Sequence, residues 1–137
     1  MKNWLWRAVA NMLSPWRERQ ARLQISRGTA YGKQEFVDQL RKDGVNMEVG
    51  NCVYVRIQGI ADIPAFSIRP EDSMHKIFGV VDEDLDDLAQ EILSDLGIPK
   101  SPTGECGVEV PVFDCTIRDL ALFVNDYYLR TFPDRKH

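Results

Sequence analysis

The sequence predicts an all-α protein, and two segments carry most of that prediction. Residues 82–96 and 116–130 each place apolar side chains at the three- and four-residue spacing of one helix face. Each segment also begins with residues that favour a helix start. The chain has 137 residues, of which 44% are hydrophobic and 28% charged. This composition is typical of a soluble globular domain and excludes a disordered or collagen-like chain.

The helix predicted over residues 82–96 has signals at both ends. Asp82, Glu83 and Asp84 occupy its first turn, where the helix dipole favours negative charge. Gly97 follows at the position where a left-handed residue ends many helices. One face is apolar and is expected to be buried, and it consists of Leu85, Leu88, Ala89, Ile92, Leu93 and Leu96.

The helix predicted over residues 116–130 begins with a capping-box spacing, Thr116 at the N-cap and Asp119 three residues later. Pro133 closes the segment. The apolar connection at 108–113, which lies between the two helices, is expected to cover the core. The core-facing side chains of the helix are Ile117, Leu120, Ala121, Val124 and Tyr128.

Residues 28–47 are expected to form a linker and one short helix. Two glycines in the stretch 27–35 favour the linker. The short helix is predicted over 34–42, and Gly44 stands just past its end. The apolar face of this helix comprises Phe36, Val37 and Leu40.

The stretch 48–61 fits two secondary structures. Val53, Val55 and Ile57 alternate as in a strand, whereas Val53, Ile57 and Ile60 fall on one face of a helix. Periodicity alone does not decide between strand and helix here.

The first 27 residues form a basic arm. They contain six basic residues against one acid, a net charge of +5, and since the whole chain carries −4, the remainder carries −9. Apolar residues recur at helical spacing from Trp4 to Trp16. Ser14 and Pro15 have the character of an N-cap and a first helical residue, so a second helix is expected to begin there and to run through the arginines. Residues 1–27, 28–47 and 48–137 are therefore expected to be three separate units.

All three tryptophans lie in this arm. Indole rings beside arginines suit an anionic membrane surface. We therefore expect residues 1–25 to bind such a surface, and the same stripe would equally pack on the protein's own body or on a partner. The candidate membrane-binding residues are Trp4, Leu5, Arg7, Trp16, Arg17 and Arg19.

Several function classes are disfavoured by the sequence. A pI near 5.2 disfavours nucleic-acid binding. No apolar run is long enough to span a membrane. The three cysteines, Cys52, Cys106 and Cys115, are odd in number and lack a C-x-x-C spacing, so reduced thiols and no metal site are expected. Phosphate-loop, HExxH and GxSxG motifs do not occur. We expect no catalytic residues, no enzyme and a cytoplasmic protein.

A further pattern covers residues 68–98. It begins with Ile68-Arg69-Pro70-Glu71-Asp72-Ser73, continues through Gly79 and the 82–96 helix, and ends with Gly97-Ile98. This pattern resembles the centre of the acyl carrier protein family, in which Ile-x-Pro-Glu-x-Ser leads through Gly-x-Asp-Ser-Leu into an amphipathic helix ending in Gly-Ile. The start of the 116–130 helix is similar to the family's last helix. The resemblance covers about half the chain and implies a four-helix bundle, with 48–61 as its first helix, extended here by N-terminal amphipathic helices.

The chain departs from the family at the attachment position. In carriers the serine of Asp-Ser-Leu bears phosphopantetheine, and the gapless alignment places Asp82 there. A carboxylate does not accept that group, and Asp82 is expected to be the helix N-cap instead. Asp72-Ser73-Met74 is similar to Asp-Ser-Leu, so Ser73 is the alternative attachment site. At that register, however, Gly79 would stand where a core leucine belongs.

The outer face of the 82–96 helix is acidic, and no lysine or arginine occurs between residues 79 and 98. In carriers the corresponding helix meets basic patches on partner enzymes, so the resemblance implies a basic protein partner here. Such a field also steers a basic partner on physical grounds. The basic arm of the same chain is a second candidate partner, and a solvated face without a partner is the alternative. The residues of this acidic face are Asp86, Asp87, Glu91 and Asp95.

Together these patterns predict a non-catalytic, acyl-carrier-like interaction module without a cofactor, located in the cytoplasm or on the inner face of the membrane. One alternative is a working acyl carrier, modified with phosphopantetheine at Ser73, that serves fatty acid, lipid or polyketide biosynthesis. A second alternative is a regulatory subunit whose tryptophan-rich arm docks into a partner protein.

Overall fold

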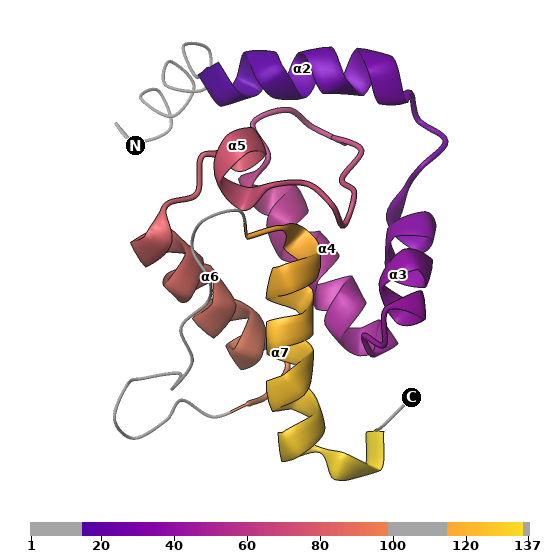
Figure 1. Ribbon diagram of the computed structural model, residues 1–137, viewed down its shortest axis with the longest axis vertical. Helices are drawn as coiled ribbons and strands as arrows, with labels where there is room; N and C mark the ends of the chain where they lie inside the picture. The colour runs from indigo at the N-terminus through magenta and orange to yellow at the C-terminus, as the bar shows by residue number, and fades with distance from the viewer. Residues whose placement is uncertain (1–14, 99–114, 136–137) are drawn as a thin grey trace.

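The computed structural model describes residues 15–98 and 115–135, and within these ranges the chain is helical (Figure 1). The only β-pairing there is an isolated antiparallel bridge between Ser73 and Thr116. The all-α prediction is confirmed for these ranges. Trp4, Leu5, Arg7 and the connection at 108–113 lie outside the described residues. The helices are α2 (Pro15–Arg27), α3 (Lys33–Lys42), α4 (Met47–Ile60), α5 (Met74–Phe78), α6 (Asp82–Asp95) and α7 (Ile117–Thr131), with a 3₁₀ turn at Pro133–Arg135.

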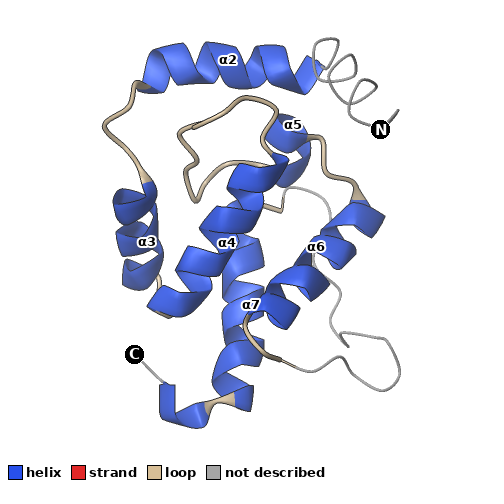
Figure 2. Ribbon diagram, turned by 180° about the vertical axis from the view of Figure 1, so that it is seen from behind, coloured by secondary structure: helices blue, strands red, loops and turns tan. Residues whose placement is uncertain are grey.

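Helix α4 is the centre of the arrangement and packs against α3, α6 and α7. Helices α6 and α7 also pack against each other. In Figure 1 helix α7 lies in front of α4, and in Figure 2, seen from behind, α4 lies in front. Helix α2 crosses the end of the molecule that holds α5, and it packs on α5. None of the described helices is long and apolar enough to cross a membrane.

The core is formed by the apolar faces that the sequence predicts. The expected core residues of the 34–42, 82–96 and 116–130 segments are buried, except that Leu96 is only partly covered. Thr116 and Asp119 form the expected capping box. The loop between α4 and α5 adds one buried aromatic side chain, Phe66, and one buried aliphatic side chain, Ile68.

The ambiguous stretch 48–61 is helical up to Ile60 and forms most of α4, and Ala61 is the C-cap. Asn46 caps this helix because its side chain accepts a hydrogen bond from the Glu48 backbone N–H, at 2.9 Å. Val53 and Ile57 are fully buried, whereas Val55 is 59% exposed. The four-residue period therefore matches the buried face, and the alternation that would have indicated a strand includes an exposed residue.

One sequence-based expectation about the region before α6 needs correction. Val81, not Asp82, is the N-cap of α6, because its extended backbone precedes the helix and its carbonyl accepts the first helical hydrogen bond from Leu85, at 2.9 Å. Asp82 is the exposed first residue of the helix and makes no cap bond. Residues 74–78 form the short helix α5, which Ser73 caps and left-handed Gly79 ends.

Candidate functional site

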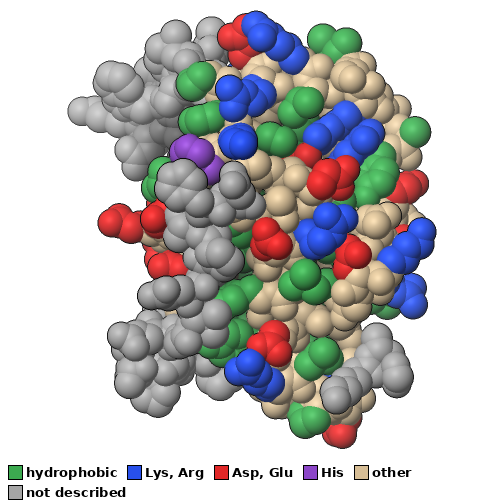
Figure 3. Space-filling view, in the orientation of Figure 1, with side chains coloured by type: hydrophobic (Ala, Val, Ile, Leu, Met, Phe, Trp, Pro, Cys, Tyr) green, Lys and Arg blue, Asp and Glu red, His purple; other side chains and the backbone are tan. Residues whose placement is uncertain are grey.

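The acidic face predicted from the sequence lies on the outer side of α6, where Asp86, Asp87, Glu91 and Asp95 are all exposed. Acidic side chains project from the edge that the start of α6 forms in Figure 3. The opposite side of the same helix carries Leu85, Leu88 and Ile92 into the core. Helix amphipathicity therefore positions the four carboxylates together.

One arginine from α4 neutralises half of this face. Arg56 donates to both carboxylate oxygens of Asp95, at 2.6 and 2.8 Å, and to Glu91, at 3.1 Å. The hydrogen bond from Arg56 holds the pKa of Asp95 below its usual value. The same bond raises the pKa of Arg56. The segment 79–98 supplies no counter-charge of its own, but α4 does, because it packs alongside α6.

Two residues of the acidic face, Asp87 and Glu91, border a hollow of about 360 Å³ between the end of α4, the end of α5 and α6, and Asp84 from the first turn of α6 joins them there. Asp84 and Asp87 stand at this hollow and form no ion pair within residues 15–98 and 115–135. We call this hollow the acidic groove. Its apolar lining residues are Ile60, Phe78, Val80 and Leu88, joined by Gly79, and its acidic residues are Asp84, Asp87 and Glu91.

The two candidate attachment residues lie in different settings. Asp82 is exposed at the start of α6. The hydroxyl of Ser73 accepts a hydrogen bond from the Lys76 backbone N–H, at 3.0 Å, and the residue is partly buried beside Thr116. Ser73 therefore has a structural role as the N-cap of α5.

Of the candidate membrane residues, the structure describes Trp16, Arg17 and Arg19. Trp16 is partly buried, with its ring centroid 6.0 Å from that of His75, and the indole lies against Gly79. Arg19 covers the indole, 5.5 Å from its centroid, and donates to the Lys76 carbonyl. Arg17 is exposed. In this structure Trp16 and Arg19 therefore make contacts with α5.

Polar side chains of α2 also face the body of the protein, beside the partly buried Leu23. Gln20 is fully buried, donates to the Ile77 carbonyl at 3.0 Å and accepts from the Asp62 backbone N–H at 2.8 Å. Gln24 accepts from the Ser67 backbone N–H. At the end of the helix, the Arg27 guanidinium pairs with both oxygens of the buried Asp72 carboxylate. These residues were not singled out by hydrophobic periodicity, since polar residues at that spacing resemble a solvent-facing side.

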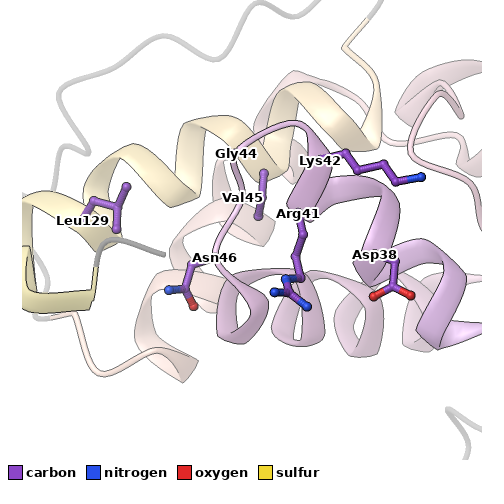
Figure 4. Close-up of a pocket in the computed structure, with 7 residues that line it drawn as sticks. All are labelled: Asp38, Arg41, Lys42, Gly44, Val45, Asn46 and Leu129. Carbon is purple, nitrogen blue, oxygen red and sulfur yellow. The ribbon is translucent and has the colours of Figure 1, made fainter.

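A second hollow, larger and open, lies between the end of α3, the α3–α4 turn and α7 (Figure 4). Arg41 and Lys42 give it a basic edge, and Asp38 adds one acid. Val45 lies at the turn and is buried, and Leu129 comes from α7. No sequence pattern predicts a role for these residues.

Metal and thiol chemistry have little support among the described residues. No three histidine, cysteine or acidic side chains group there as a metal site would require. Cys115 is 2% exposed, and this burial raises the pKa of its thiol to about 11. Burial also raises the pKa of Cys52. Both thiols are therefore protonated at neutral pH, which disfavours nucleophilic reactivity.

Comparisons with protein-family models, with curated proteins and with solved structures gave no match to this chain. The resemblance to acyl carrier proteins therefore depends on the motifs in residues 68–98 and 116–130 alone.

Proposed function

We propose that this chain is a non-catalytic, acyl-carrier-like interaction module that binds a basic amphipathic segment of a partner protein in the acidic groove. The observation that carries the proposal is the groove itself, which combines an apolar lining with two carboxylates, Asp84 and Asp87, that form no ion pair within the described residues. An apolar anchor on the partner would bury surface against Leu88 and Ile60, while lysines or arginines would meet Asp84 and Asp87.

The acyl-carrier-like architecture is part of this proposal. The region that the resemblance assigns to the first bundle helix, 48–61, coincides with α4, and the regions assigned to the central and last helices coincide with α6 and α7. The short helix α5 and its loop fill the interval between α4 and α6. The similarity of order supports a carrier-like bundle, and function does not follow from fold alone.

We propose further that the module carries no phosphopantetheine. Asp82 stands where carriers have the modified serine, and the Ser73 hydroxyl is used as a helix cap. Incubation with coenzyme A and a broad-specificity phosphopantetheinyl transferase should leave the intact mass unchanged. A mass increase that maps to Ser73 would favour the working carrier instead.

Groove binding can be tested with a lysine- and leucine-rich amphipathic helical peptide as probe. Reversing two groove charges, Asp84→Lys with Asp87→Lys, should weaken binding by about tenfold or more at low salt. A matched control, Asp38→Lys with Asp134→Lys, makes the same change in net charge on exposed residues away from the groove. Equal weakening by both pairs would mean that only the overall charge matters, and the groove would not be the site.

A location on the inner surface of a membrane is a related proposal. The outer side of α2 presents Arg17 and Arg22 to solvent, together with Ile25, which is 86% exposed. Basic residues beside an apolar side chain favour the surface of an anionic bilayer. The remaining residues of the proposed contact, Trp4, Leu5 and Arg7, lie outside the described residues.

A further inference from the structure

Side chains of helix α2 donate hydrogen bonds to carbonyl groups at the C-terminal end of α5. The last carbonyls of a helix lack partners within that helix. Two carbonyls of α5, those of Met74 and His75, accept from the backbone N–H groups of Val80 and Gly79, at 3.1 and 3.0 Å. The next two, those of Lys76 and Ile77, accept from the side chains of α2 residues Arg19 and Gln20.

The turn that α2 stabilises is also a wall of the acidic groove. Phe78, Gly79 and Val80 line the groove and follow directly after the carbonyls that α2 holds. Gly79 has a left-handed φ of 68° and faces the indole of Trp16, so closely that a Cβ there would overlap the ring. Trp16 therefore packs on the outside of the same wall.

Gln20 joins this wall to a second one, which the end of α4 forms. Its amide nitrogen donates to the Ile77 carbonyl, one residue before Phe78, while its amide oxygen accepts from the backbone N–H of Asp62, two residues after Ile60. Phe78 and Ile60 line the groove from different helices. Because the Gln20 side chain is fully buried, it has no competing water, and both bonds fix the spacing between the walls.

We propose that α2 is a clamp for the acidic groove, with Gln20 and Trp16 as positioning residues, so that partner binding requires α2 to be docked on α5. This inference rests on the proposed function, because it concerns the regulation of the same groove. Neither side chain lines the groove, so both act through the wall residues. Any event that pulls α2 away would loosen both walls and weaken partner binding.

The test compares two glutamines of one helix in the full chain. Gln20→Ala removes the bonds to both walls, whereas Gln24→Ala removes bonds to Ser67 and Gly28, which lie away from the groove. Gln20→Ala should lower affinity for the lysine- and leucine-rich peptide by about fivefold or more, and Gln24→Ala by less than about twofold. Equal affinities for Gln20→Ala and the unaltered protein would overturn the clamp.

Amide hydrogen exchange gives a second readout that does not use the peptide. In Gln20→Ala the N–H groups of Asp62, Gly79 and Val80 should exchange faster than in Gln24→Ala, because their local structure opens more often. Unchanged protection of these three amides would overturn the clamp. If Gln20→Ala does not fold, Trp16→Ala serves instead, since it loosens the same wall while Gln20 and its two hydrogen bonds stay in place.

The failure of the proposed function can be told apart from the failure of the clamp. If the unaltered protein does not bind the peptide, the groove is not the partner site and the proposed function is wrong. Hydrogen exchange then still decides whether Gln20 holds the two walls. If the unaltered protein binds the peptide and both glutamine variants bind it with the same affinity as the unaltered protein, only the clamp is wrong.

Discussion

Replacing Arg27 by alanine should cost a large part of the stability of the protein. The Asp72 carboxylate is 1% exposed and the Arg27 side chain 11%. The guanidinium donates to Asp72 at 2.8 Å and to the Ser67 carbonyl at 2.7 Å, while the Arg69 backbone N–H donates to Asp72 at 2.9 Å. Without the guanidinium, a buried carboxylate keeps only one of these partners.

Breaking a buried ion pair by removing one partner costs about 3–5 kcal/mol, because the remaining charge is left without compensation. For a protein with a total stability of about 5–15 kcal/mol this is a large fraction. A chain of this size loses about 3–4 °C of Tm per kcal/mol, so the expected decrease is roughly 10–20 °C. Urea and thermal unfolding followed by far-ultraviolet circular dichroism would measure both quantities.

The matched control is Arg22→Ala in the same helix. Arg22 is 78% exposed and pairs with Glu18 at i−4, which is 68% exposed, so its loss should cost no more than about 0.5 kcal/mol. In the Arg27→Ala background, Asp72→Asn should recover part of the stability, since it removes the stranded charge. If Arg27→Ala unfolds within about 1 kcal/mol of the unaltered protein, the ion pair does not hold α2 in place.

Three further outcomes follow from the described structure. Leu88→Ala should destabilise by about 2–5 kcal/mol in urea unfolding, since Leu88 is 6% exposed in the core, and an unchanged midpoint would mean that this face is not buried. Cys115, whose pKa is about 11, should react with iodoacetamide only after unfolding at about pH 8, as mass spectrometry of the labelled peptide would show. The pKa of Asp95 is lowered by Arg56, so the stability from this pair is complete above the usual pKa of 3.8 and is lost as the pH falls through the lowered value. Arg56→Ala should therefore reduce this acid-side loss of stability in an acid titration, and an identical titration would contradict the assignment.

The long helices could be predicted from the sequence because each has local signals that agree with its packing. Thr116 and Asp119 form the expected cap, and Gly97 ends its helix with a left-handed φ of 80°. The secondary structure of the stretch that forms α4 could not be decided in this way, since Val53 and Ile57 fit both the helical and the strand period. Only the position of the buried face, which depends on α3, α6 and α7, excludes the strand.

The groove and the polar contacts of α2 could not be predicted, for a different reason. The acidic residues of the groove were recognised in part, but its lining comes from three helices that are far apart in the sequence. Gln20 and Gln24 bind backbone groups of the 61–78 region, and such groups have no sequence signature. Apolar periodicity indicates side chains like that of Trp16, whereas a buried amide has the same sequence pattern as a solvent-facing one.

The contacts of α2 also change how membrane binding must be tested. Deleting residues 1–25 would remove the proposed lipid contacts together with Gln20 and Gln24, and a loss of binding would then be ambiguous. Arg17→Glu avoids this problem because Arg17 is exposed, so the Tm should stay unchanged. Co-sedimentation with anionic vesicles should decrease, most clearly at low salt. Equal sedimentation of Arg17→Glu and the unaltered protein would argue against the α2 surface as a lipid contact.

Gly79→Ala tests membrane binding from the α5 side of the contact between Trp16 and Gly79. A Cβ at Gly79 would overlap the indole of Trp16, and the left-handed φ of 68° adds a cost of about 1 kcal/mol. The substitution should therefore displace Trp16 from α5 while Arg17 stays intact. If indole insertion contributes to membrane binding, the displaced tryptophan becomes available and Gly79→Ala should sediment with anionic vesicles more strongly than the unaltered protein. The same variant in a Trp16→Ala background should show no such gain. A gain that persists without Trp16, or no gain in either background, would mean that Trp16 serves only the packing of α2 on α5.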